Sequence, residues 1–115
     1  MPLSIQTREK SGVVVLELSG RIVAGEECES LRRKTKELLA SNQTKILQNF
    51  KDVAYIDSTG IGALVEAVIL TAKAGGTLKL VNVPRLVYNI LHTHRLLQAF
   101  EVYENEEEAL TSFSK

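Results

Sequence analysis

The residues with the clearest chemical potential are Asp57, Ser58, Thr59 and Gly60, which lie between two apolar runs. An aspartate or serine at the N-cap of a helix accepts a hydrogen bond from one of the first backbone amides, which have no partner inside the helix. Capping therefore explains one of these side chains. It does not explain three potential caps in succession, so Ser58 is a candidate phosphoacceptor whose hydroxyl is available for other chemistry.

Two glycines, Gly60 and Gly62, follow within the first helical turns. Each costs up to about 1 kcal/mol relative to alanine inside a helix, so helix stability did not select them. We expect them to clear the space around Ser58, so that another molecule can approach its hydroxyl. The free amides and the positive end of the helix dipole favour a phosphate there. Phosphoserine beside Asp57 would gather a charge of about −2.5 to −3, enough to repel a docked partner, which is the design of a binding switch.

Other reactive side chains indicate no catalytic or metal site. A serine hydrolase needs the pattern Gly-x-Ser-x-Gly and a histidine base, but Ile56 stands two residues before Ser58. His92 and His94 are expected just past the third helix, and Cys28 on an apolar helix face, where it is core and not a ligand. We therefore predict a protein that is not an enzyme and that holds no metal and no cofactor.

A phosphate-receiving aspartate, as in response-regulator receiver domains, is the second alternative to a serine switch. Such a domain needs an acidic pair after its first strand to bind magnesium. The segment 18–21, Leu-Ser-Gly-Arg, contains no acid, which argues against that interpretation.

The composition narrows the classes of partner. Lys plus Arg and Asp plus Glu number 14 each, so no net charge attracts nucleic acid or an anionic membrane. Trp is absent and aromatic residues make up 5 per cent, which leaves few stacking platforms for single-stranded nucleic acid. One cysteine forms no internal disulfide, and no apolar run approaches the length of a membrane span. We expect one domain over residues 1–115, cytoplasmic and monomeric, with no nucleic-acid or membrane partner.

Hydrophobic periodicity predicts alternating strands and helices. Residues 3–7 alternate, a Ser-Gly turn follows, and residues 13–18 indicate a buried strand, so the chain opens as a hairpin. Residues 20–25 are expected to form a loop, and apolar residues spaced by three and four predict a helix over about 25–40. The remaining predicted elements are a strand at 45–50 with further apolar residues to 56, a helix ending before 75–76, a strand at 77–81, a helix after Pro84, a short strand at 100–103, and a last helix capped by Asn105.

The predicted fold class is α/β, in the order β-β-α-β-α-β-α-(β)-α. Each strand-helix-strand step needs a right-handed crossover, which gives a partly parallel mixed sheet of four to five strands with about four helices. Functional loops of such sheets lie beyond the carboxyl ends of the strands. The segment from Asp57 to Gly60 is expected on a loop of this kind.

These motifs carry a family resemblance. The run LQNFKDVAYIDSTGIGALVEAVILTAKAGGTLKLVNV resembles the core of the STAS domain (sulfate transporter and anti-sigma factor antagonist), in particular the stand-alone bacterial anti-sigma factor antagonists. The similarity extends from the VVVLELSGRI segment to the final EEEALTSF segment. Its most specific part is Asp-Ser-Thr-Gly followed by Ile-Gly-Ala-Leu, and Asn49 matches a polar position in the preceding strand.

The resemblance implies a function for Ser58. In that family the serine after the aspartate is phosphorylated by a serine/threonine kinase that is itself the anti-sigma factor and that brings ATP and magnesium. The unphosphorylated antagonist binds this kinase and frees a sigma factor, the phosphorylated form dissociates, and a serine phosphatase resets the switch. Besides the phosphoacceptor Ser58, the residues expected to bind the partner are Asp57, Thr59, Gly60, Ile61, Gly62, Arg21, Ile22, Val23, Ala24 and Gly25.

Two positions depart from the family pattern. The segment from Arg21 to Gly25 is basic and apolar, where such antagonists often carry an acidic pair, which suggests a different or re-tuned partner. Gln48 interrupts an apolar strand, so it is expected either at a sheet edge or beside a buried hydrogen-bond partner. The alternative function is that of a STAS accessory subunit of a transporter ATPase or of a stress-signalling scaffold.

Overall fold

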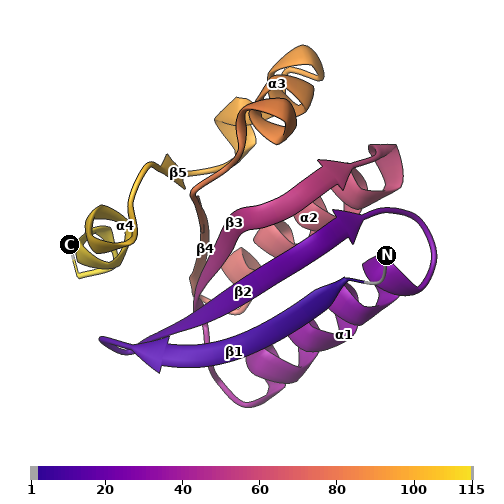
Figure 1. Ribbon diagram of the computed structural model, residues 1–115. Coiled ribbons are helices and arrows are strands. Elements are labelled where there is room, and N and C mark those ends of the chain that lie inside the picture. The colour runs from indigo at the N-terminus through magenta and orange to yellow at the C-terminus, as the bar shows by residue number, and fades with distance from the viewer. Residues whose placement is uncertain (1–2, 115) are drawn as a thin grey trace.

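The computed structural model describes residues 3–114 and contains one five-stranded mixed sheet with helices on both faces (Figure 1). The strand order is β1-β2-β3-β4-β5, in which β1 pairs antiparallel with β2 and the other neighbours are parallel. This arrangement confirms the predicted fold class. The elements are β1 (Ser4–Lys10), β2 (Val13–Ile22), α1 (Glu26–Ala40), β3 (Lys45–Ile56), α2 (Ser58–Lys73), β4 (Thr77–Val81), α3 (Arg85–Thr93), the 3₁₀ helix η1 (Leu97–Ala99), β5 (Val102–Tyr103) and α4 (Glu106–Ser112).

The sheet buries both of its faces over part of its area. Alternate side chains of β2 point to opposite faces: Leu16 and Leu18 join the larger core with α1, α2 and α3, whereas Val13 and Val15 pack with Leu110 of α4. A strand with two covered faces reads as a continuous apolar run, which is the pattern of residues 13–16. The larger core lies directly behind the strands that end at the Ser58 loop.

Two strands are longer than the sequence predicts. β2 continues to Ile22, so Gly20 and Arg21 belong to a strand and not to a loop. β3 runs unbroken to Ile56, because its outer half keeps pairing with β2 after shifts of register on either side of Ser19. Irregular parallel pairing of this kind depends on the neighbouring strand and leaves no local pattern in the sequence. The segment that starts at Gly20 therefore reads as a loop although it pairs as a strand.

Helix starts agree with the predicted caps to within a residue. The Asn105 side chain accepts a hydrogen bond from the Glu108 backbone N–H at 2.9 Å, which is the predicted capping interaction. Pro84 is the N-cap of α3 and not its first helical residue. No helix of the described chain is both long and apolar enough to cross a membrane.

Gln48 contradicts both expectations for it. It lies in the middle of the sheet, between Leu16 of β2 and Leu80 of β4, and it is fully buried. Neither its Oε1 nor its Nε2 has a hydrogen-bond partner within residues 3–114. The larger core therefore contains an amide that folding removes from water without compensation.

Candidate functional site

Ser58 is the first residue of α2 and lies where β2 and β3 end side by side (Figure 1). The Asp57 backbone N–H donates to the Ile22 carbonyl at 3.2 Å, which holds the turn before Ser58 against the end of β2. The Ser58 side chain is exposed. The loop thus stands at the carboxyl ends of two parallel strands, the position expected from the topology.

Asp57 is the N-cap of α2 and also joins two loops. Its Oδ1 accepts a hydrogen bond from the Gly60 backbone N–H at 2.7 Å, and its Oδ2 accepts one from the Ala24 backbone N–H at 3.0 Å. The second bond crosses from the β3–α2 turn to the segment that leads from β2 into α1. One carboxylate therefore starts the helix and fixes the neighbouring loop to it.

The hydrogen bonds of Asp57 outweigh its partial burial. Burial raises the pKa of this carboxyl, but the amides of Ala24, Gly60 and Thr59 stabilise the charged form, and the net effect is a lowered pKa. A group with a lowered folded pKa contributes stability that is present above its unfolded pKa of about 3.9. The contribution of Asp57 is therefore lost as the pH falls from about 4 through the folded pKa.

Ser58 is left without a structural task. Because Asp57 caps the helix, the Ser58 hydroxyl is not needed as a cap, and it makes no side-chain hydrogen bond to any part of the chain between residues 3 and 114. Thr59 is exposed in the same way. Of the three potential caps in the sequence, Asp57 is the cap, and the Ser58 and Thr59 hydroxyls make no side-chain hydrogen bond within the described residues.

The two glycines have different roles. Gly60 is buried, and a Cβ built on it would overlap the Ile22 carbonyl oxygen and lie 2.9 Å from Ile56 Cγ1. The expectation that Gly60 clears space for a partner is therefore wrong, since it permits close packing of α2 on the end of β2. Gly62 does fit that expectation, because it is exposed, lies one turn from Ser58 on the same helix face, and has nothing within 4 Å of a built Cβ.

The remaining predicted partner-binding residues divide into a surface set and a supporting set. Ile22 is fully buried and Ile61 is 6 % exposed, so both hold the loops from beneath. Val23 is half-buried, and Arg21, Ala24 and Gly25 are exposed. The pairing of Arg21 with Tyr55 and of Ile22 with Ile56 brings this surface set to the carboxyl ends of β2 and β3, where Ser58 also lies.

Tyr55 lies at the same strand ends and was missed in the sequence. Tyr55 is 39 % exposed, and the centroid of its ring lies 5.7 Å from the Arg21 guanidinium carbon, in cation–π contact. An aromatic residue shortly before the Asp57-Ser58 motif was the available signal. The Arg21 and Tyr55 side chains thus form a stacked pair at the ends of β2 and β3, beside the Ser58 loop.

Cys28 and the histidines add no reactive group to Ser58. Cys28 is 1 % exposed, and its burial, followed by the nearby Asp57 charge, raises the pKa of its thiol. His94 is the C-cap of α3, but His92 lies within its last turn, so the helix runs further than expected from the sequence. Over residues 3–114, no three His, Cys, Asp or Glu side chains are grouped so as to hold a metal ion.

Replacing Asp57 with serine tests the connection between the loops. Serine is expected to keep the α2 cap, but its short side chain does not also reach the Ala24 N–H, so the protein should lose about 1 kcal/mol of stability. Hydrogen exchange should accelerate at Ala24 while the Gly60 amide stays protected. Asp57→Ala, which removes both bonds, is the control and should expose both amides. Unchanged protection of Ala24 in Asp57→Ser would contradict the assignment.

Comparison with known proteins places this geometry in a family. The model of the STAS domain matches residues 4–109. A curated relative, the anti-sigma F factor antagonist of Paenibacillus polymyxa, is 27% identical over 112 residues, which cover 96% of this chain and 95% of the relative.

Solved structures show the same fold. An anti-sigma factor antagonist from Mycobacterium paratuberculosis superposes with a TM-score of 0.83 at 19% identity, covering 98% of this chain and 95% of the other. The phosphorylated form of the Bacillus cell fate determinant SpoIIAA gives a TM-score of 0.71 at 22% identity, with coverage of 95% and 98%. With a family model that spans nearly all of its length, this chain belongs to the STAS domain family.

Proposed function

We propose that this protein is an anti-sigma factor antagonist, a non-catalytic binding switch controlled by phosphorylation of Ser58. In its unphosphorylated form it binds an anti-sigma factor serine/threonine kinase in the cytoplasm and thereby releases a sigma factor. The observation that carries the proposal is the free, exposed hydroxyl of Ser58 beside an aspartate that already caps the helix. The name of the Paenibacillus polymyxa relative supports the same function.

The docking surface consists of exposed residues on the two joined loops and the start of α2. Its members are Arg21, Val23, Ala24, Gly25, Ser58, Thr59 and Gly62, and the buried Ile22, Gly60 and Ile61 set its shape from beneath. The kinase supplies ATP and magnesium, so this chain needs no cofactor of its own. A serine phosphatase restores the binding form.

Phosphorylation would change this surface in charge and in volume. The pKa of Asp57 is lowered, so its carboxylate is ionised at neutral pH. A phosphoserine at position 58 adds about −1.5 to −2 beside that charge. Both oxygens of Asp57 are occupied by Gly60 and Ala24, so the carboxylate does not turn away, and a partner packed on the neutral surface is expelled.

The first test is the phosphorylation state in the source cells. Peptide mapping of the isolated protein from growing and from stressed cells should find one phosphoryl group on Ser58 whose occupancy falls under stress. Absence of phosphate in both states would favour the accessory-subunit alternative. The same fold also occurs within a larger transporter. The mouse anion transporter Slc26a9 contains a segment, 18% of its chain, that superposes on this protein with a TM-score of 0.74 at 20% identity.

The second test measures the switch directly. Ser58→Glu should reduce binding of the kinase captured by the wild-type protein at least about tenfold, and phosphoserine more, because a carboxylate has less charge than a phosphate. The variant should remain folded, since an acid in the first turn of a helix is stabilising. Ala72→Glu, at the exposed far end of α2 and outside the docking surface, is the control for an added charge. Ser58→Ala should bind without being switched. Full kinase binding by Ser58→Glu and by the phosphoserine form would overturn the proposal.

A further inference from the structure

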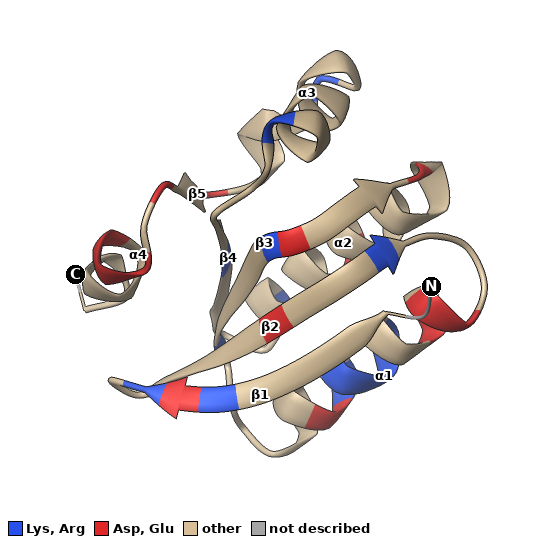
Figure 2. Ribbon diagram, viewed as in Figure 1, with Lys and Arg blue, Asp and Glu red and all other residues tan. Residues whose placement is uncertain are grey.

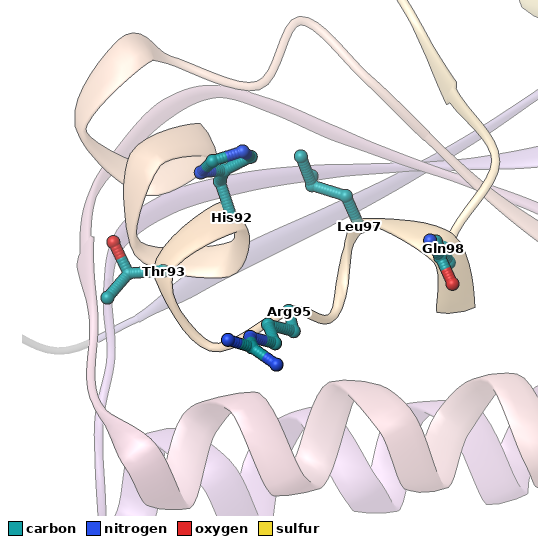
Figure 3. Close-up of a pocket in the computed structure, with 5 residues that line it drawn as sticks. All are labelled: His92, Thr93, Arg95, Leu97 and Gln98. Atoms are coloured by element: carbon teal, nitrogen blue, oxygen red, sulfur yellow. The ribbon is translucent and has the colours of Figure 1, made fainter.

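A second feature of the molecule is a pocket of about 520 Å³ at the end of α3, whose lining shares no residue with the Ser58 loop. Figure 3 shows that its lining comes from the last turn of α3, the following turn and η1. His92 and Leu97 project on the upper side of this turn, and Arg95 and Gln98 on the lower side. The lining residues, which define the Arg95 pocket, are His92, Thr93, Arg95, Leu97 and Gln98.

The segment around the pocket carries positive charge in a protein whose net charge is zero. The sequence contains no Asp or Glu from residue 67 to residue 100, although the whole chain has as many acids as bases. Figure 2 shows α3 and the turn after it with basic residues and no acidic ones. Every polar lining group, a guanidinium, an imidazole, a hydroxyl and an amide, is able to donate a hydrogen bond.

Arg95 occupies a position at which glycine is expected. Its N–H donates to the His92 carbonyl at 3.0 Å, and the Leu96 N–H donates to the Leu91 carbonyl at 2.9 Å, which together form a Schellman motif. The residue at this place adopts a left-handed conformation, and Arg95 has a φ of 59°. Glycine takes this conformation without steric penalty and arginine does not. A strained residue in a pocket is a reason to look for a function of its side chain.

The Arg95 guanidinium also differs from most other arginines of the protein. Arg8, Arg32 and Arg33 each contact a glutamate, and Arg21 stacks on Tyr55. Arg95 has no salt bridge within residues 3–114 and is exposed. Its charge is therefore available to a ligand.

The dipole of α3 opposes an anion at this end of the helix. The opposition is weakened because the Schellman bonds occupy the carbonyls of Leu91 and His92. A full charge on Arg95 in direct contact with an anion outweighs the screened half-charge of a short helix.

We propose that the Arg95 pocket binds the oxyanion group of a small molecule, a phosphate or a carboxylate. Arg95 donates the charge-assisted hydrogen bonds, and the Gln98 amide, which projects on the same side of the turn, adds a further donor. His92 and Leu97 project on the opposite side and bound the pocket without contacting the oxyanion. No residue of the Ser58 loop lines the site.

Titration of the protein with inorganic phosphate, and separately with citrate, tests this site and distinguishes the two sources of oxyanion. Backbone amide resonances of Thr93, Arg95 and Gln98 should shift saturably with one or both probes. Arg95→Gly should weaken binding at least about tenfold, the worth of one charge-assisted interaction. The same variant should be more stable than the wild type, because it relieves the left-handed strain, so lost binding will not reflect unfolding.

Two control variants separate the pocket from general charge. Arg85→Gln removes a basic residue from the first turn of α3, outside the lining, and should leave the affinity unchanged. Arg95→Lys keeps the charge without the planar fork and should fall between wild type and Arg95→Gly. No saturable shift with either probe, or equal affinity in Arg95→Gly and wild type, would overturn the proposal.

Discussion

Gly60→Ala is expected to destabilise the protein by about 3 kcal/mol or more, although it adds only one methyl group. The new Cβ would overlap the Ile22 carbonyl oxygen and lie 2.9 Å from Ile56 Cγ1. The carbonyl is backbone in the parallel pairing of β2 with β3, so it is unable to move as the end of a flexible side chain does. Helix α2 must therefore shift away from the sheet, and the Asp57 hydrogen bonds shift with it. Urea unfolding of the two proteins measures the difference.

Gly62→Ala is the matched control for this substitution. It lies two residues further along the same helix, is exposed, and has open space around a built Cβ. Alanine should therefore stabilise the protein by up to about 1 kcal/mol through helix propensity alone. Similar changes in both variants would mean that propensity, and not packing on Ile22, determines the role of Gly60.

The second large effect is an increase in stability. Gln48→Met should raise the free energy of unfolding by about 1–3 kcal/mol, because it replaces an unpartnered buried amide with an apolar side chain of similar length. The site between Leu16 and Leu80 is already lined by apolar groups and has room for an unbranched chain of this size. Thermal or urea unfolding will show the gain, which is unusual for a substitution in the centre of a sheet.

Asn49→Leu controls for the general effect of removing a buried amide. Asn49 is the next residue of β3 and is 7 % exposed, but its side chain is fully engaged. Its Nδ2 donates to Glu17 Oε1 at 3.0 Å, and its Oδ1 accepts from the Lys51 N–H at 3.0 Å and from Asn82 Nδ2 at 3.2 Å. Removing these bonds should cost about 1–3 kcal/mol. A loss of stability in Gln48→Met comparable to that in Asn49→Leu would show that the Gln48 amide is satisfied in solution.

The comparison of these neighbours shows where sequence reasoning reaches its limit. Both amides interrupt an apolar strand, and the sequence predicts a partner or a sheet edge for Gln48, whereas Asn49 only matches a polar position of the family. Only Asn49 has partners. Glu17 of β2 and Asn82, which directly follows β4, are more than thirty residues away, and only the Lys51 backbone N–H is local. No local pattern distinguishes the two positions, because the difference lies in which side chains the adjacent strands place opposite them.

The same limit separates Gly60 from Gly62. Both read as helix-weakening residues, and only the contact of α2 with the end of β2 shows that one is required by packing and the other is open. The length of β2 has a similar origin. Its last residues form a strand because β3 pairs with them, although their own sequence favours a loop.

The sequence by itself determined the alternation of strands and helices, the cap at Asn105, a second cap among Asp57, Ser58 and Thr59, and the place of Ser58 at the start of a helix. These features depend on interactions between residues at most a few positions apart, which the periodicity and capping rules describe. The tertiary structure decided that Asp57 also holds Ala24, that Ser58 is therefore free, and that Gly60, Ile22 and Ile61 lie beneath the docking surface. Those facts depend on contacts between segments more than thirty residues apart, whose geometry exists only once the parallel sheet has formed.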